Sequence, residues 1–207
     1  MGRLFYLRWR MNATSNKEKL QRFIQQHISI TNEAADQIAA EFEEIVIPKH
    51  DLFLRAGSYA NHYMFLCDGF LRAYTLDQEG SPVTTGFYQS PTVVFEVYSF
   101  FNRTISTENI EALVDSEGLI ITYDKLNHLF HSLPGFRDFG RSMLVRGFVN
   151  LKYRMLSMIN ETAEERYNNL IRNNPDIFQF APLKDIASYL GITDTSLSRI
   201  RKNIVHK

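Results

Sequence analysis

The chain has 207 residues, of which 44% are hydrophobic, 13% aromatic and 22% charged. This composition excludes a disordered chain, a collagen-like chain and a disulfide scaffold, and it predicts a folded protein of one or two domains. The 23 lysines and arginines balance the 23 aspartates and glutamates, so any nucleic acid or membrane would have to be met by a local charged patch.

The cysteine content and the N-terminal residues both indicate the cellular compartment of the protein. Cys67 is the single cysteine, so it cannot form an internal disulfide, and one thiolate cannot hold an iron–sulfur cluster, which needs about four ligands. Residues 1–10 are basic and aromatic, but their uncharged run is too short for a signal peptide, and no apolar stretch has the length of a membrane helix. We expect a cytoplasmic protein without membrane contact, in which residues 1–15 are a flexible extension and Met11 is an alternative start.

The first half of the chain predicts helices followed by strands. Residues 16–42 have helical periodicity in two pieces. From residue 43 to residue 122, eight short apolar runs recur about every ten residues between turn residues, a spacing typical of a β-sandwich or barrel. The runs fall at residues 45–47, 52–54, 63–66, 70–76, 84–88, 93–97, 109–113 and 119–122.

A long helix is predicted over residues 136–160, after a short helix at 123–131 that Pro134 and Gly135 are expected to end. Its apolar residues step by four, three, four and three, which is the spacing of a coiled-coil seam. The seam consists of Leu144, Phe148, Leu151, Met155 and Met158. Phe136, Phe139 and Met143 form a second apolar edge that can lie on the β domain. Either the seam meets a second copy of the chain, or the helix is buried in its own domain; we favour the first and predict a homodimer.

The C-terminal residues 182–202 have the pattern of a helix-turn-helix. A first apolar helix face contains the small Ala187, which lets a second helix cross closely, and Gly191 ends that helix. Thr193 caps the next helix, whose inner face is formed by Leu197, Ile200 and Ile204. The residues predicted to face DNA are Thr193, Asp194, Thr195, Ser196, Ser198, Arg199 and Lys202.

The chemistry of this outer face fits the major groove of double-stranded DNA. Arginine can pair with two acceptors of guanine, and hydroxyl groups bind phosphates or base edges. Four cations and no carboxylate lie between Arg199 and Lys207, so the local basic patch that a neutral chain requires is here. The alternative is an ordinary helical hairpin with a solvated basic tail.

The sequence from Gly191 to Lys202 resembles the recognition motif of the family of the cyclic-AMP receptor protein and the fumarate and nitrate reductase regulator (Crp/Fnr), with Thr195 where a glutamate is usual. The resemblance covers about residues 30–204. It implies an α+β chain with a cyclic-nucleotide-binding-like double-stranded β-helix (jelly roll) at residues 16–135. A dimerisation helix at 136–160 and a DNA-binding helix-turn-helix domain at 161–207 would follow.

The resemblance also implies roles for individual residues and a partner. Asp194, Thr195 and Arg199 would lie nearest the base edges, and Ser196 would touch phosphate. The protein would be a bacterial transcriptional regulator that binds a pseudo-palindromic operator and contacts RNA polymerase. Its target genes, and whether it activates or represses them, stay open.

The nucleotide cassette of that family is altered in this chain. Without a gap, the family's Gly-Glu pair falls on Phe95-Glu96, and its Arg-Ser/Thr-Ala falls on Ser106-Thr107-Glu108. The phosphate-binding arginine is therefore lost and a carboxylate is gained, so we expect no response to cyclic AMP. The candidate pocket residues are Glu96, Arg103, Ser106 and Thr107, where Arg103 either reaches in from a neighbouring position or is an ordinary loop arginine. The effector is unknown; the pocket is empty, binds another molecule or is part of the scaffold.

Catalytic and metal sites are not indicated by any motif. His128 and His131 could present two imidazoles from one helix, but no third ligand is evident. We therefore predict no metal, no cofactor and no enzymatic role. The rival interpretation is a cupin-like β-barrel that binds a small molecule or a metal, or acts as an enzyme, without binding DNA.

Overall fold

The computed structural model describes residues 14–205. Residues 1–13 and 206–207 lie outside this range, so the expectations for most of the N-terminal extension, Met11 included, and for Lys207 fall on undescribed residues. Helix α2 (Asn16–His27) begins at a capping box formed by Ser15 and Glu18, and α3 (Asn32–Ala40) is capped by Thr31. These two helices account for the periodicity predicted at residues 16–42.

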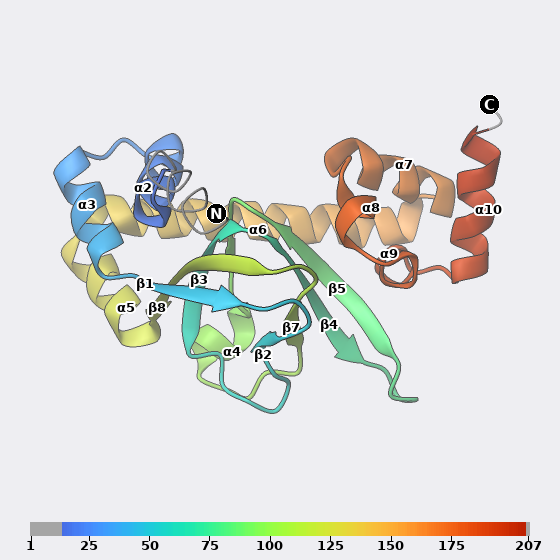
Figure 1. The fold of residues 1–207 in the computed structure, drawn as a ribbon, viewed down its shortest axis with the longest axis horizontal. Coiled ribbons are helices and arrows are strands. Elements are labelled where there is room, and N and C mark those ends of the chain that lie inside the picture. Colours follow the sequence, from blue (N-terminus) through green and yellow to red (C-terminus); the bar gives the residue numbers. More distant parts are fainter. Residues whose placement is uncertain (1–13, 206–207) are drawn as a thin grey trace, which may run out of the picture.

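Eight antiparallel strands form two four-stranded sheets (Figure 1). One sheet has the order β1-β8-β3-β6 and the other has the order β2-β7-β4-β5. The strands are β1 (Glu43–Ile47), β2 (Leu52–Leu54), β3 (His62–Asp68), β4 (Phe70–Leu76), β5 (Pro82–Gln89), β6 (Thr92–Val94), β7 (Asn109–Ala112) and β8 (Ser116–Thr122). Of the two predicted architectures, sandwich and barrel, the two sheets form the sandwich, with strands close to the positions of the short apolar runs.

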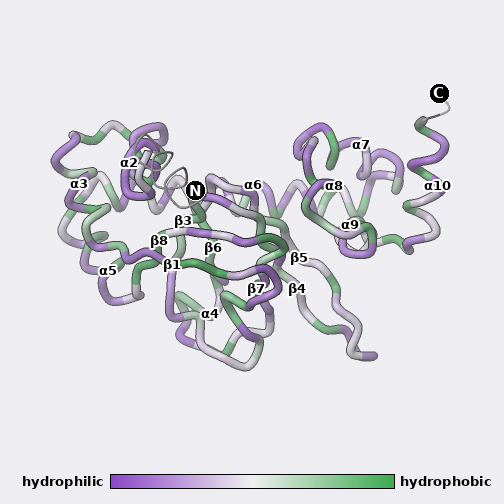
Figure 2. The backbone as a smooth tube through the Cα atoms, in the orientation of Figure 1, coloured by the Kyte–Doolittle hydropathy of each residue, from purple (hydrophilic) through white to green (hydrophobic). Residues whose placement is uncertain are grey.

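One hydrophobic core joins both sheets to the helices beside them. Phe65 of β3 and Leu71 of β4 are fully buried in it. Helix α5 (Tyr123–Ser132) and the first half of α6 (Pro134–Asn160) close this core together with α2. Aromatic rings join these helices to each other: Phe130 of α5 stacks on Phe136 of α6 at 5.2 Å, and the ring of Phe23 in α2 lies 6.1 Å from that of Phe139 in α6. Hydrophobic segments fall mainly in the strands, whereas α2 and α7 are mostly hydrophilic (Figure 2).

The structure differs from the expected elements in two places. The apolar run at residues 93–97 ends as a strand at Val94, and a short helix α4 (Val97–Asn102) follows. The reason is Glu96, whose carboxylate accepts hydrogen bonds from the backbone N–H groups of Tyr98 and Ser99 and so caps the helix. Secondly, α6 begins at Pro134, two residues before the predicted start, because proline suits the first helical turn. The short helix α5 ends before this proline, at Ser132, as predicted.

The C-terminal domain consists of α7 (Ala163–Asn173), α8 (Ile177–Phe180), α9 (Leu183–Leu190) and α10 (Asp194–Val205). The short helix α8 had no counterpart among the predicted elements. These helices share a second hydrophobic core that includes Phe70 and Leu113 of the β domain. The C-terminal domain therefore packs directly on the β domain, and α6 runs along both (Figure 1). Within the described part of the chain, no helix is long and apolar enough to span a membrane.

The turn between β3 and β4 provides a stability test. Gly69 has φ +116°, and a Cβ added there would lie 2.8 Å from the Cα of Ser116. Gly69→Ala should lower the free energy of unfolding by about 3 kcal/mol, because a strained φ is combined with a backbone clash. In the control Gly57→Ala, φ is also positive but an added Cβ meets no described atom within 4 Å, so the loss should be about 1 kcal/mol. Urea denaturation measures both, and equal losses would contradict the clash.

Candidate nucleic-acid interface

The turn between α9 and α10 has the backbone geometry that its glycine predicts. Gly191 adopts a left-handed conformation with φ +67°, and the backbone N–H of Ile192 donates to the carbonyl of Ala187 at 3.0 Å. A Cβ at position 191 would lie 2.5 Å from the Cε of Met158, at the end of α6. The left-handed backbone conformation is what favours glycine at this turn, because the terminal methyl of Met158 belongs to a flexible side chain that can move aside.

Thr193 and the apolar residues of α10 fix the orientation of that helix. The Thr193 hydroxyl accepts a hydrogen bond from the backbone N–H of Ser196 at 3.2 Å, as an N-cap does. Leu197 is buried between α10 and α9, and Ile200 and Ile204 pack against the same core. Because one face of α10 is buried in this way, the opposite face is presented to solvent.

The outer face of α10 contains the residues that the sequence predicted. Six of the seven are exposed and Ser196 is half-buried; the exposed ones are Thr193, Asp194, Thr195, Ser198, Arg199 and Lys202. Arg201 takes a different position, because its guanidinium lies over the ring of Phe178 at 4.9 Å. Arg199 and Lys202 are thus the cations of the described α10 that face solvent.

Helix α6 presents an exposed apolar face on the side opposite its buried residues Phe136 and Phe139. The five residues of the predicted seam are all exposed, at between 42% for Leu144 and 67% for Phe148. Sequence analysis missed the other half of this face, which consists of Val145, Val149, Leu156 and Ile159. Their spacing of four, seven and three residues is a second helical row that the sequence contains.

Glu96 and Arg103, two of the four candidate pocket residues, are engaged in contacts within the protein. Glu96 caps α4 and lines a cavity of about 70 Å³, and the other three candidates are not among the residues that line it. Arg103 has a left-handed backbone conformation with φ +53°. Its guanidinium donates to the carbonyl of Ala60 at 3.3 Å and to the side chain of Asn61 at 2.9 Å.

The other two candidates belong to the segment before β7. Ser106 is buried, and its hydroxyl accepts from the backbone N–H of Glu108 at 3.0 Å and donates to the carbonyl of that residue at 2.9 Å. Thr107 is exposed. Burial raises the pKa of the nearby Tyr88 phenol, and the negative charges of Glu108 and Glu96 raise it further. The carboxylates of Glu96 and Glu108 thus place negative charge beside this segment, which disfavours the binding of another anion such as a cyclic phosphate.

Two further features concern possible chemical sites, namely the thiol of Cys67 and the side chains that could bind a metal ion. Cys67 is buried, and burial raises the pKa of its thiol to about 12, which makes it a poor nucleophile. Among residues 14–205, no group of three or more His, Cys, Asp and Glu side chains is placed to hold a metal ion.

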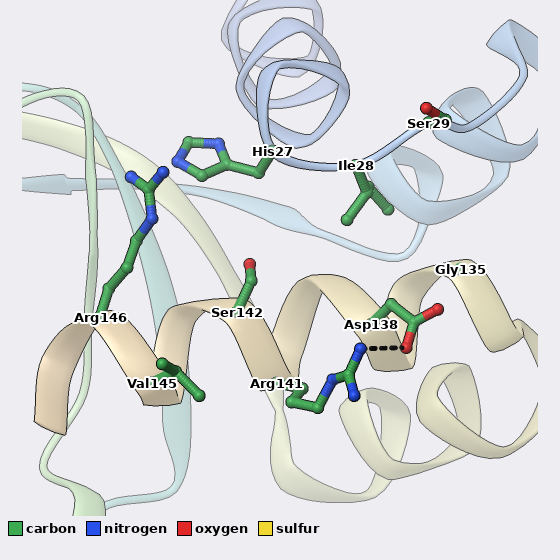
Figure 3. A pocket seen from close by; sticks show the side chains of 9 residues that line it. All are labelled: His27, Ile28, Ser29, Gly135, Asp138, Arg141, Ser142, Val145 and Arg146. Carbon is green, nitrogen blue, oxygen red and sulfur yellow. Dashed lines mark ion pairs between the residues drawn. The ribbon is translucent and has the colours of Figure 1, made fainter. Parts of the chain in front are cut away.

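A groove of about 660 Å³ lies between the C-terminus of α2 and the first half of α6 (Figure 3). Arg146 and His27 point toward one another across it, whereas Arg141 forms an ion pair with Asp138 at 3.4 Å. Val145 lines this groove and also belongs to the exposed apolar face of α6. The groove therefore borders the exposed apolar face of α6.

Comparison with known proteins adds to this geometry. Residues 44–132 match the model of the cyclic nucleotide-binding domain family. Over 166 residues, the chain is 25% identical to the fumarate and nitrate reduction regulatory protein of Yersinia pestis; the match covers 74% of this chain and 65% of that protein. The chain thus spans less than two thirds of the length of this curated relative.

Solved structures share the whole architecture. FixK2 from Bradyrhizobium japonicum has a TM-score of 0.67 at 18% identity, covering 80% of this chain and 85% of that one. A protein from Eubacterium rectale, described as a regulator of the Crp/Fnr family, also has a TM-score of 0.67, at 16% identity, covering 86% of this chain and 85% of that one. At such identities the likeness concerns the fold.

The β-sandwich with its nucleotide-binding-domain match, the long helix and the C-terminal helix-turn-helix agree with the sequence relative and with these folds. Residues 44–132 thus match the cyclic nucleotide-binding domain family, and the chain as a whole is similar in sequence and fold to transcriptional regulators of the Crp/Fnr type.

Proposed function

We propose that this chain is a cytoplasmic, homodimeric regulator that binds a specific double-stranded DNA sequence and acts on transcription, with RNA polymerase as a partner. The outer face of α10 is the observation that carries the proposal. Arg199 and Lys202 are exposed there beside small hydroxyl side chains, while Leu197 on the opposite side is buried. A helix that is held in this way can enter the major groove without any rearrangement of its own domain.

Pairing of two chains through the exposed apolar face of α6 is the second part of the proposal. Nine large apolar residues are exposed on this face, and the most exposed are Ile159 at 70%, Phe148 at 67% and Leu151 at 64%. Burying such a continuous row against a symmetry-related copy removes apolar area from water. Two recognition helices would then meet half-sites about 34 Å apart, one turn of DNA.

The third part of the proposal is that cyclic AMP is not the effector. The contacts of Glu96 and Arg103 within the protein support it, because both charged groups already have partners. The candidate residues also do not gather around one cavity: of the four, Glu96 alone lines the described cavity of about 70 Å³, which is far below the roughly 300–1,000 Å³ of typical small-molecule sites.

Base recognition by α10 can be tested with two substitutions. Arg199→Ala should weaken binding to the selected operator by about 1–3 kcal/mol and relax its base preference, because it removes a paired contact to guanine. Lys202→Ala should instead weaken all DNA sequences alike and lower the salt slope by about one, as expected for a phosphate contact. Fluorescence anisotropy at two salt concentrations, with the exposed Arg55→Ala as control, would reject the assignment if Arg199→Ala bound like the control.

Dimerisation can be tested at the centre of the apolar face. Phe148→Asp should convert the dimer to a monomer, because it places a charge on each chain where apolar surface would be buried. Operator affinity should fall about 100-fold or more, since one helix-turn-helix alone covers half the site. Sedimentation equilibrium measures the mass, with Val46→Asp on β1 as a control at a residue of similar exposure, 70% against 67% for Phe148. A dimer that survives Phe148→Asp would refute this interface.

The effector part predicts that cyclic AMP leaves operator affinity unchanged within about twofold, because the pocket lacks its cationic phosphate ligand. Titration calorimetry of the protein with millimolar cyclic AMP should show no binding, and operator affinity should be compared with and without the nucleotide. Saturable binding that shifts operator affinity tenfold would contradict this part and leave the DNA-binding proposal standing.

A further inference from the structure

Three parts of the molecule meet at one irregular point of β5. The register pairs Ala73 of β4 with Gly86 of β5, but pairs Tyr74 with Thr84, so Thr85 is the extra residue of a β-bulge. Bulges bend a strand and interrupt its hydrogen-bond ladder, which leaves backbone groups for other partners. Here those partners come from α6 on one side and from the helix-turn-helix on the other.

Arg154 of α6 is the partner of the bulge carbonyls. Its guanidinium donates to the carbonyl oxygens of Thr85 at 2.7 Å and of Thr84 at 3.3 Å, both in β5. The same group donates to the carbonyl of Tyr189 in α9 at 3.2 Å and lies 4.3 Å from the centre of the Tyr189 ring. One side chain of the long helix therefore binds the β domain and the first helix of the helix-turn-helix together.

Thr84 holds the other side of the junction through its remaining polar groups. Its backbone N–H donates to the hydroxyl of Ser188 in α9 at 2.9 Å. Its hydroxyl accepts from Nε of Arg72 at 2.9 Å, and Arg72 forms an ion pair with Asp185 of α9 at 3.0 Å. Both charged side chains are nearly completely buried, and this burial raises the pKa of Asp185, an effect that the Arg72 guanidinium opposes.

Aromatic packing covers these polar contacts. The ring of Phe70 in β4 stacks on Phe180 at 5.1 Å, and the ring of Phe87 in β5 lies 5.2 Å from that of Tyr189. The Arg72–Thr84 hydrogen bond and the Arg72–Asp185 ion pair are buried, so the loss of one partner there is costly. Polar and aromatic contacts together attach α9 to β4 and β5 at several points.

We propose that Arg154 is a positioning residue for DNA recognition: it joins α6, the β5 bulge and α9 so that the two α10 helices of a dimer are held at one fixed separation. This inference rests on the proposed function. In a dimer paired through α6, the place of each recognition helix depends on how α9 is attached to α6, and Arg154 makes that attachment directly. Through Thr84 and Thr85, a change in the β domain would move the same attachment.

Arginine is suited to this position in a way that lysine is not. Its planar fork donates in several fixed directions and stacks on an aromatic ring, whereas an ammonium group is a compact point charge. The Arg154 guanidinium has three carbonyl acceptors, two in β5 and one in α9, and it also lies over the ring of Tyr189, an arrangement that its planar geometry can satisfy. Arg154→Lys should therefore keep the charge and lose the positioning.

The test measures how operator affinity depends on the spacing of the half-sites. A palindromic duplex is first selected from a random library on the full-length wild-type chain, and versions with one or two base pairs inserted at its centre are then compared. Wild type should lose about tenfold or more in affinity on insertion of one base pair, a difference of about 1.4 kcal/mol. Arg154→Ala and Arg154→Lys should reduce this discrimination to about threefold or less, with unchanged affinity for a single half-site.

The matched control is Arg146→Ala, an exposed arginine two turns earlier on the same helix, which should behave as wild type. Sedimentation and urea denaturation establish that each variant is a folded dimer. If Arg154→Ala does not fold, Ser188→Ala is used in its place. This variant loses only a hydroxyl, the one that accepts a hydrogen bond from the backbone N–H of Thr84. It too should reduce the loss of affinity that follows insertion of a base pair between the half-sites.

If the folded, dimeric Arg154 variants lose as much affinity on insertion of a base pair as wild type does, the inference is overturned and the proposed function stands. A wild-type chain that selects no duplex would overturn the proposed function itself, and the inference with it.

Discussion

The direction of the recognition helix depends on the burial of α8 and α9 against the outer surface of β4 and β5. Ile177, Ile186 and Leu190 share one core with Phe70 of the β domain, so the small C-terminal domain is not independent of the large one. The buried Arg72–Asp185 pair adds little net stability by itself, but loss of one partner would leave an uncompensated buried charge. Such a contact favours one position of the C-terminal domain on the β domain over nearby positions, as the proposed recognition of two spaced half-sites requires.

Helix α6 has different partners on its two sides along its length. Its first half lies on the β domain through Phe136 and Phe139, and its second half reaches the C-terminal domain through Arg154 and Met158. The opposite side is apolar and exposed. One helix thus connects the proposed dimer contact, the β domain and the C-terminal domain, so a shift of any one of them would change the position of α9 relative to the other two.

Much of this architecture was predictable, because local patterns match the final environment. The short apolar runs between residues 43 and 122 predicted the strands. Gly191 and Thr193 predicted the turn and the N-cap of the helix-turn-helix. Glu96 became a helix cap where the family resemblance indicated a ligand contact, since a carboxylate that follows a strand can serve either purpose. Arg154 could not be placed from sequence, because its partners are backbone carbonyls distant in the chain; the available signal was a charge on the face of α6 that contains Phe136.

The central claim is that two α10 helices are presented together at the spacing of one DNA turn. The most direct measurement is the dipolar coupling between spin labels attached at Ser198→Cys in the two chains of the dimer, with the buried Cys67 replaced by serine. The account predicts one narrow distance distribution centred near the roughly 34 Å that separates half-site centres. A broad distribution, or no coupling between chains, would contradict it.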